Sequence, residues 1–325
     1  MSHVPEVVLD AAGGDAGGAA RWRVELDRYL AAGAGGVSVI GRGRQLTPGW
    51  LLRRERLAGG AHLVVAPNNV SFSVSGGERR VLLRNALHFL YASEKHLLAR
   101  MPKSVRIQIP VVHRVLSRAS VIVVPCTAMA ERVAHHVPSA AARVVIRPHP
   151  VTPAGARTPA ETPFVLVPVV PGPYKNLVSQ LRLLLSTAER LKHPARVHVT
   201  ANASDLPADL ATHPRVTAMG VVPHSELAGA WRSAAAAFYP SIVESFGYPL
   251  AESRVYGVPV IAPDTPQARE IAGRALVPYS PDDAGSVADA VCRIGEDVPA
   301  EPLAFDSTTY FDWLLATETR PRGNP

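Results

Sequence analysis

The feature that most constrains this chain is a repeated alternation between short β-branched runs and longer amphipathic stretches. Residues 63–66 and 121–124 are such runs, and residues 19–32 form the first helical pattern. Strands that alternate with helices in this way are typical of βα units, which build parallel sheets. The sequence therefore predicts an α/β protein made of open, Rossmann-like sheets. The expected strands are 4–9, 36–40, 63–66, 121–124, 144–146, 164–170, 196–200, 236–240 and 259–262, and the expected helices are 19–32, 78–100, 129–136, 176–191, 225–234, 249–256, 266–272 and 305–317.

Length, proline and charge all indicate two domains. The chain has 325 residues, and residues 148–163 are rich in proline and break the periodicity. We predict an N-terminal domain over 1–150, a linker over 151–163, a C-terminal domain over 164–303, and a final helix and tail over 304–325. Residues 1–150 hold 20 Lys and Arg against 9 Asp and Glu, whereas the remainder is mildly acidic. This basic half suggests an anionic partner such as a phosphate, a membrane surface or a nucleic acid.

Composition excludes several classes of protein. Apolar residues make up 47% and charged residues 19% of the chain, which excludes wholesale disorder. Two cysteines, Cys126 and Cys292, do not form a disulfide scaffold and are typical of a reducing compartment. The N-terminus lacks a basic segment followed by a long apolar one, which a secretory signal needs. No apolar run in the sequence is long enough to span a bilayer. We therefore expect a cytoplasmic protein.

The segment from Tyr239 to Ala262 contains the most informative chemistry. Its order predicts a buried strand, then a turn with Glu244 and Gly247, then a short helix that begins near Pro249 and ends before Gly257. A helix that begins at the carboxyl end of a parallel strand is a site where open α/β sheets bind ligands, and its N–H groups favour an anion. Glu252 lies about one turn inside this helix and can face the same crevice as Glu244.

This segment resembles the E-x7-E region of the family-four retaining glycosyltransferases, with Glu244 and Glu252 as the two acids. Three further stretches follow the family pattern in the same order. They are Pro173–Leu177 (P-Y-K-N-L), Met219–Leu227 (M-G-V-V-P-H-S-E-L), and the pair Gly257–Ala262 (G-V-P-V-I-A) with Glu270–Gly273 (E-I-A-G). The resemblance covers about residues 164–275.

The resemblance implies a GT-B fold, in which two Rossmann-like domains face one another across a cleft, and a nucleotide-sugar donor used without a metal or another cofactor. It implies that Glu252 binds the ribose hydroxyls and that Glu244 contacts the donor sugar. It further implies that Lys175 contacts the diphosphate while the loop at Phe246 and Gly247 holds sugar or phosphate oxygens. The remaining donor-side candidates are Tyr248, Gly220 and Val222. UDP-sugar is the default donor, and the acceptor is a hydroxyl of a small molecule or glycan.

The N-terminal half departs from the family pattern. Gly17 and Gly18, with Gly13 and Gly14, resemble a loop that approaches phosphate and acceptor, although a flexible turn explains them equally well. Asn68 and Asn69 stand where the family often has a catalytic histidine, and we favour a plain turn over contact with sugar.

Two further departures concern the phosphates and the linker. Val170 replaces an arginine that commonly precedes the diphosphate lysine, and Arg147 is a candidate substitute from the other domain. Thr127 is the candidate for a family Ser/Thr that follows the fifth strand, and His88 is expected to have a core or surface role.

Alternatives remain open at this point. The Arg- and Leu-rich stretch 78–91 could be a helix on an anionic membrane, although a domain helix with one packed face is the interpretation we favour. Nucleic-acid binding is disfavoured because no recognised motif accompanies the basic charge. A nucleotide-sugar hydrolase or phosphorylase-like enzyme and a non-catalytic sugar-nucleotide-binding protein are the competing functions. The sequence does not reveal the oligomeric state.

Overall fold

The computed structural model describes residues 6–14, 17–33, 35–101, 103–172 and 174–316. The chain divides into two compact units, one made of residues 1–92, 102–150 and 307–325 and the other of residues 93–101 and 151–306. The stretch expected to be a linker, 151–163, belongs to the second unit, whereas the last helix belongs to the first. Residues 4 and 5 of the expected first strand and residues 317–325 of the tail lie outside the described part of the chain.

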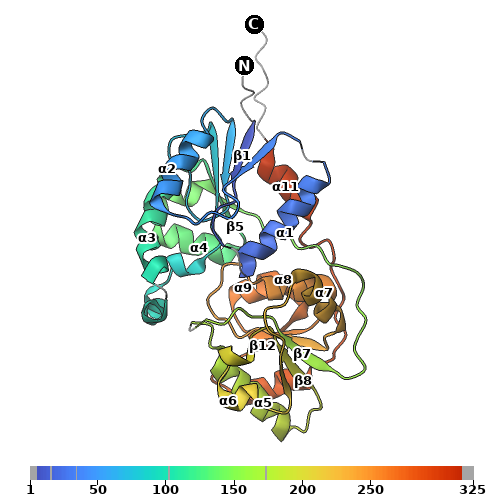
Figure 1. The fold of residues 1–325 in the computed structure, drawn as a ribbon. Helices are drawn as coiled ribbons and strands as arrows, with labels where there is room; N and C mark the ends of the chain where they lie inside the picture. Colours follow the sequence, from blue (N-terminus) through green and yellow to red (C-terminus); the bar gives the residue numbers. More distant parts are fainter. Residues whose placement is uncertain (1–5, 15–16, 34, 102, 173, 317–325) are drawn as a thin grey trace. The chain divides into compact units, whose positions relative to one another are not determined.

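The first unit contains a six-stranded parallel sheet with the strand order β2-β1-β3-β4-β5-β6 (Figure 1). The first strand, β1, lies second from one edge; β2 forms that edge, and β3 to β6 follow in order on the other side of β1. The strand order therefore reverses between β1 and β3, which is where doubly wound sheets form a crevice. The strands are β1 Val7–Asp10, β2 Val37–Ile40, β3 Leu63–Ala66, β4 Glu78–Leu82, β5 Val121–Val124 and β6 Val144–Ile146.

Helices cover both faces of the first sheet. In Figure 1, α1 and α11 lie on one face, and α2, α3 and α4 lie on the other. The local sequence explains the helix starts; for example, the Thr47 side chain caps α2 by accepting a hydrogen bond from the Trp50 N–H at 3.2 Å. The helices are α1 Gly17–Ala31, α2 Pro48–Leu57, α3 Lys103–Val115, α4 Thr127–His136 and α11 Ser307–Leu315, with 3₁₀ turns at Ala86–His88, Leu116–Arg118 and Pro138–Arg143. A further 3₁₀ turn at Ala92–Arg100 falls almost entirely in the segment assigned to the second unit.

The expectation of a long helix over 78–100 is wrong. Residues 78–82 instead form β4, a central strand that pairs with β3 and β5, and two 3₁₀ turns follow it. The apolar part of this strand is the short run from Val81, and periodicity alone does not separate so short a run from a helix segment. The alternative of a membrane-bound helix over 78–91 is wrong for the same reason. Helices α2 and α3 were not expected.

The C-terminal helix α11 packs on α1. The Trp22 Nε1–H donates to the Tyr310 hydroxyl at 3.2 Å, and the Trp22 and Phe311 rings meet edge to face at 5.4 Å. The buried guanidinium of Arg80, on β4, donates to the Leu314 carbonyl at 2.9 Å. An arginine at a helix C-terminus satisfies carbonyls that have no partner within the helix. This contact explains why a charged residue occupies a buried strand.

The second unit contains another six-stranded parallel sheet, with the order β12-β11-β10-β7-β8-β9. Here β7 comes first in the chain, β8 and β9 follow on one side, and β10 to β12 follow on the other. The strand order reverses between β7 and β10, which pair directly. The strands are β7 Phe164–Val167, β8 Arg196–Val199, β9 Val216–Ala218, β10 Ala236–Phe238, β11 Val260–Pro263 and β12 Leu276–Tyr279.

One core of the second unit lies between its sheet and the helices α5 and α10. Val165 and Val167 of β7 pack there with Leu181 of α5 and Val291 of α10. Helix α7 contacts α8, and α8 contacts α9. The helices are α5 Leu177–Arg190, α6 Ala208–Ala211, α7 His224–Ser233, α8 Tyr248–Tyr256, α9 Pro266–Ala272 and α10 Ala284–Cys292, with 3₁₀ turns at Ala203–Asp205 and Gly273–Ala275.

The proline-rich stretch 151–163 follows the surface of the second unit without helix or strand. Its backbone is held by hydrogen bonds, including Thr158 N–H to the Arg232 carbonyl at 2.8 Å and Ala160 N–H to the Ser233 carbonyl at 3.1 Å. The Arg157 guanidinium also donates to the Gly257 carbonyl at 2.9 Å. These bonds attach the segment to the ends of α7 and α8.

Candidate functional site

The strand order of the second sheet brings two predicted site residues together. Lys175 lies in the loop between β7 and α5, and Glu244 lies in the loop between β10 and α8. Because β7 and β10 are parallel neighbours at the reversal of strand order, both loops leave the same edge of the sheet. Open α/β sheets bind ligands in this position. The site therefore lies at the switch point of the second unit.

Lys175 and Glu244 form a loose ion pair. The Lys175 Nζ lies 3.8 Å from the Glu244 Oε1, with 16% and 20% of the two side chains exposed. That separation exceeds hydrogen-bonding distance, so the ammonium keeps its donors for another oxygen. The Ser241 hydroxyl donates to the same Glu244 oxygen at 2.9 Å and orients the carboxylate. The pair places a cation and a carboxylate side by side at a partly open edge.

Two tyrosines that the sequence analysis did not single out complete this cluster. Tyr239 is buried, and its hydroxyl bonds with Glu244 and Ser241. Burial, with the nearby charge of Glu244, raises the pKa of Tyr239 well above its usual value. Burial also raises the pKa of Tyr174 to about 12, and Glu244 adds to this shift. Both phenols therefore stay protonated at neutral pH. In the sequence, the only local signals for these tyrosines are that Tyr239 directly follows a strand and that Tyr174 directly precedes Lys175.

The start of α8 has the form predicted from the sequence. Gly247 is its N-cap, with a left-handed φ of 75°, and Pro249 occupies the first turn. A Cβ at Gly247 would lie 2.9 Å from the Leu250 Cδ1 and 3.2 Å from the Gln267 Nε2, so any other residue would force a neighbour to shift. The Gln267 side-chain amide donates to the Phe246 carbonyl and fixes the loop. The Phe246 ring is buried against the rings of Tyr248 and Phe305. The side chains of Phe246 and Tyr248 therefore pack inside the second unit.

The other donor-side candidates lie at separate places in the second unit. Glu252 is a buried residue of α8, with 3% of it exposed. Gly220 follows β9 with φ of 75°, and its N–H donates to the Ala201 carbonyl at 3.0 Å. Val222 is half-buried just before α7. Pro173 of the P-Y-K-N-L motif lies outside the described residues.

The N-terminal candidates belong to the first unit, around its own switch point. Gly17 and Gly18 are the first residues of α1, and Gly17 has a positive φ of 59°. Gly13 and Gly14 have positive φ and form the preceding loop. Its Gly13 carbonyl accepts a hydrogen bond from Arg23 at 3.2 Å.

Asn68 and Asn69 form the turn after β3, and both side chains have structural partners. The Asn68 amide donates to the Asp10 carboxylate at 2.9 Å, and Asp10 also pairs with Arg54 at 2.8 Å. All three are buried. The Asn69 side chain accepts a hydrogen bond from the Arg84 N–H at 2.6 Å. These contacts favour the structural interpretation of the turn.

The remaining candidates of the first unit are placed as follows. Arg147 is exposed, and its guanidinium lies 4.8 Å from the centre of the Trp313 ring. Thr127 is the exposed first residue of α4. His88 lies in a 3₁₀ turn, buried, and not in the expected long helix. Its burial, with an electrostatic contribution from nearby His113, lowers its pKa from 6.5 to about 4.

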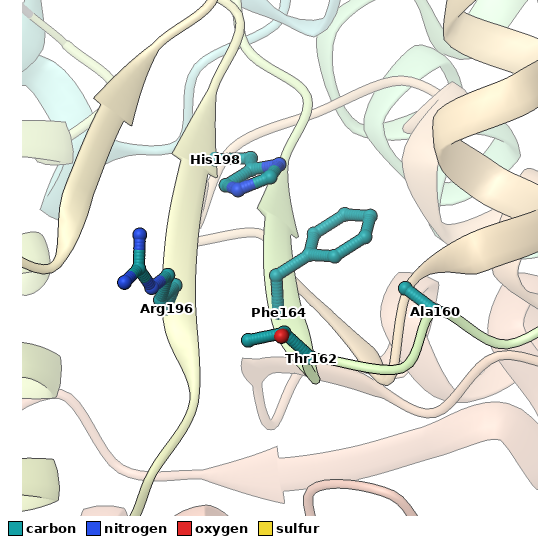
Figure 2. A pocket seen from close by; sticks show the side chains of 5 residues that line it. All are labelled: Ala160, Thr162, Phe164, Arg196 and His198. Atoms are coloured by element: carbon teal, nitrogen blue, oxygen red, sulfur yellow. The ribbon is translucent and has the colours of Figure 1, made fainter.

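A hollow of about 400 Å³ lies elsewhere on the second unit (Figure 2). Phe164 and Arg196 line it at the first residues of β7 and β8, and the Phe164 and His198 rings stack at 4.2 Å. Lys175 and Glu244 follow the carboxyl ends of their strands, so this hollow is separate from the candidate site. Within the described ranges, no group of three or more His, Cys, Asp or Glu residues is arranged to hold a metal ion. No described helix is both long and apolar enough to cross a bilayer.

Comparison with known proteins finds a family match within the second unit and shows the fold. Residues 169–297 match the family model of glycosyl transferases group 1, whereas no curated protein matches the chain in sequence. Among solved structures, the chain is similar to sucrose-phosphate synthase from Thermosynechococcus elongatus, with a TM-score of 0.64, 16% identity and 89% of each chain covered.

Two other solved structures are also similar to this chain over most of its length. WaaG, a glycosyltransferase involved in lipopolysaccharide biosynthesis, has a TM-score of 0.64 and 14% identity over 88% of this chain and 90% of that one. HepE of Anabaena, solved with UDP and glucose, has a TM-score of 0.60 and 12% identity over 95% and 97%. The two Rossmann-like sheets predicted from the sequence are confirmed. Residues 169–297 therefore match the glycosyl transferases group 1 in sequence, and the chain as a whole has the GT-B fold.

Proposed function

We propose that this protein is a retaining glycosyltransferase that moves a sugar from a nucleoside-diphosphate sugar to a hydroxyl acceptor without a metal. The observation that supports this proposal is the Lys175–Glu244 pair at the switch point of a group 1 domain. An ammonium and a helix N-terminus at the same edge of a sheet suit a diphosphate. A carboxylate with a fixed orientation beside them suits the hydroxyls of a sugar.

The reaction breaks the bond between the anomeric carbon and the phosphate oxygen, and negative charge grows on the leaving diphosphate. Lys175 and the start of α8 stabilise this charge, and charged hydrogen bonds of this type contribute about 1.5–3 kcal/mol each. The acceptor oxygen then bonds to the anomeric carbon from the same face, and its proton passes to the departing phosphate. Glu244 positions the donor sugar in this scheme and forms no covalent bond.

Glu244 is suited to positioning because its own surroundings are fixed. Ser241 and the protonated hydroxyl of Tyr239 bond with the carboxylate, and the Lys175 ammonium lies 3.8 Å from it. Glu252 is the candidate for the ribose hydroxyls. UDP is the default nucleotide for the first assay, and HepE, a protein of the same fold, was solved with UDP and glucose.

The first test is a thermal-shift measurement of the whole chain with UDP, GDP, ADP and TDP. A nucleotide present at 100 times its dissociation constant should stabilise the folded protein by about 2.7 kcal/mol. The shift should disappear in Lys175→Ala. It should persist in Lys192→Ala, because Lys192 is an exposed lysine just past the opposite end of α5. No shift with any of the four nucleotides would overturn the proposed donor site.

The second test addresses the chemistry with the nucleotide sugar whose nucleotide binds. Product formed in the presence of EDTA, with the anomeric configuration of the donor in its NMR spectrum, would support a retaining and metal-independent transferase. Sugar release to water that an acceptor panel does not alter would favour a hydrolase. Nucleotide binding with no turnover would favour a non-catalytic binding protein.

A further inference from the structure

One side of α3 exposes apolar side chains where a helix on a sheet ordinarily shows polar ones. Ile107 is 71% exposed and Val111 is 43% exposed, and Pro110 beside them is exposed as well. Their spacing of three and four residues puts all three on one stripe. Val112 is fully buried on another side, so the exposed stripe is not the side that packs on the unit.

Basic residues flank this stripe at both ends. Lys103 and Arg106 lie in the first turn, Arg114 lies in the last turn, and Arg118 follows in the next 3₁₀ turn; all four are exposed. None of the four forms an ion pair with another residue in the described part of the chain. The sequence contains no Asp or Glu between Glu94 and Glu131. The exposed apolar stripe is therefore flanked by basic residues that have no acidic partner within the described part of the chain.

The surface continues from α3 to α2 across the loop after β3. A hollow of about 520 Å³ is lined by Val74 of this loop and by Arg114 and Arg118. Val74 is 81% exposed, and its N–H donates to the Glu55 carboxylate of α2 at 3.1 Å. Leu52 of α2 is itself 71% exposed. Helices α2 and α3 lie on the same face of the first sheet (Figure 1).

We name this surface the docking face, defined by Leu52, Val74, Ile107 and Val111 with Lys103, Arg106, Arg114 and Arg118. We propose that the docking face binds the surface of a membrane rich in anionic lipid. Exposed apolar residues within basic charge match a bilayer, because they enter the boundary of the acyl chains while the cations contact the headgroups.

Charge and polarity argue against the other occupants. A second copy of the chain would place this cationic face against itself, which like charges oppose. A nucleic acid would match the cations, but it would not use the exposed Ile107 and Val111. A membrane surface would contact both the apolar and the basic residues of the docking face. It also differs from the stretch 78–91 considered from the sequence, which is a buried strand and its following turns.

The test is flotation of the whole chain with vesicles of phosphatidylcholine alone and with vesicles of equal parts phosphatidylcholine and phosphatidylglycerol. We expect binding to the anionic vesicles only, and weakening by salt because exposed charges are screened. Arg106→Gln/Arg114→Gln should weaken binding about fivefold for each arginine, since a basic residue near such a surface contributes about 1 kcal/mol. Ile107→Ser/Val111→Ser should weaken it about tenfold at unchanged net charge.

Matched variants separate a specific face from general charge or hydrophobicity. Leu303→Ser removes a leucine that is 78% exposed on the second unit, and Arg190→Gln/Arg274→Gln removes two exposed arginines there. Both should bind as the unchanged protein does, and circular dichroism should show that every variant is folded.

Three results would overturn the proposal. They are an absence of binding to anionic vesicles at low salt, equal losses in the control variants, and binding that Ile107→Ser/Val111→Ser leaves intact. Self-association that the same double variant abolishes would assign the face to a second copy instead. The assay contains no nucleotide sugar, so its outcome does not depend on the proposed activity.

Discussion

Substituting Gly247 by alanine tests how tightly the start of α8 is built. Gly247 has φ of 75°, in the left-handed region, where a side chain costs about 1–2 kcal/mol. The added Cβ would also lie 2.9 Å from the Leu250 Cδ1 and 3.2 Å from both the Gln267 Nε2 and the Tyr239 Cε1. Overpacking of this kind costs about 1–3 kcal/mol. Gly247→Ala should therefore lower the free energy of unfolding of the second unit by about 2–5 kcal/mol.

Gly295→Ala is the matched control for this substitution. Gly295 lies in the same unit with φ of 89°, but a Cβ there would have no atom within 4 Å. Its expected cost is the conformational cost alone, about 1–2 kcal/mol. The difference between the two variants then measures the crowding at Gly247.

The assay is urea unfolding of the whole chain followed by circular dichroism, with a separate transition fitted for each unit, because two units need not unfold as one. Nucleotide-dependent stabilisation is measured on the same samples. Gly247→Ala should lose more of it than Gly295→Ala, since the displaced loop carries Glu244 and the start of α8. Equal losses of stability in the two variants would refute the reasoning, because crowding would then contribute nothing.

Three further predictions concern the first unit. Arg54→Met leaves the carboxylate of Asp10 buried without its cation and should cost about 3–5 kcal/mol of unfolding free energy, whereas Arg42→Met at an exposed pair should cost about 0–1 kcal/mol in the same urea titration. Folding lowers the pKa of His88 from 6.5 to about 4, so stability present above pH 6.5 should be lost as the pH falls toward 4. The loss in unfolding free energy should be at most about 3 kcal/mol. His88→Asn should reduce this pH dependence when unfolding is measured at several pH values. Phe311→Ala should cost about 3–5 kcal/mol in thermal or urea unfolding of the first unit, because Phe311 is fully buried against Trp22; an unchanged midpoint would show that α11 does not stabilise this unit.

Features whose causes lie close together in the chain could be predicted from the sequence. The segment from β10 to β11 is the best example, because Gly247, Pro249 and Gly257 are all within a few residues of the helix ends that they define. The alternation of strands and helices likewise indicated two Rossmann-like units. The residues at 175, 244 and 252, together with these local signals, gave the resemblance to the family-four retaining glycosyltransferases.

Features that depend on partners far along the chain were decided only by the tertiary structure. Arg80 is tolerated in a central strand because its guanidinium reaches the end of α11, 234 residues later. The Asn68 side chain is occupied by Asp10, 58 residues earlier.

The candidate site likewise combines local features that the sequence predicts with a contact that only the tertiary structure determines. The sequence indicated that Lys175 and Glu244 each follow a strand, but strand order determines whether two such loops meet. Only the direct pairing of β7 with β10 brings their side chains to 3.8 Å, because the sheet hydrogen bonds that set this order join residues about 70 positions apart.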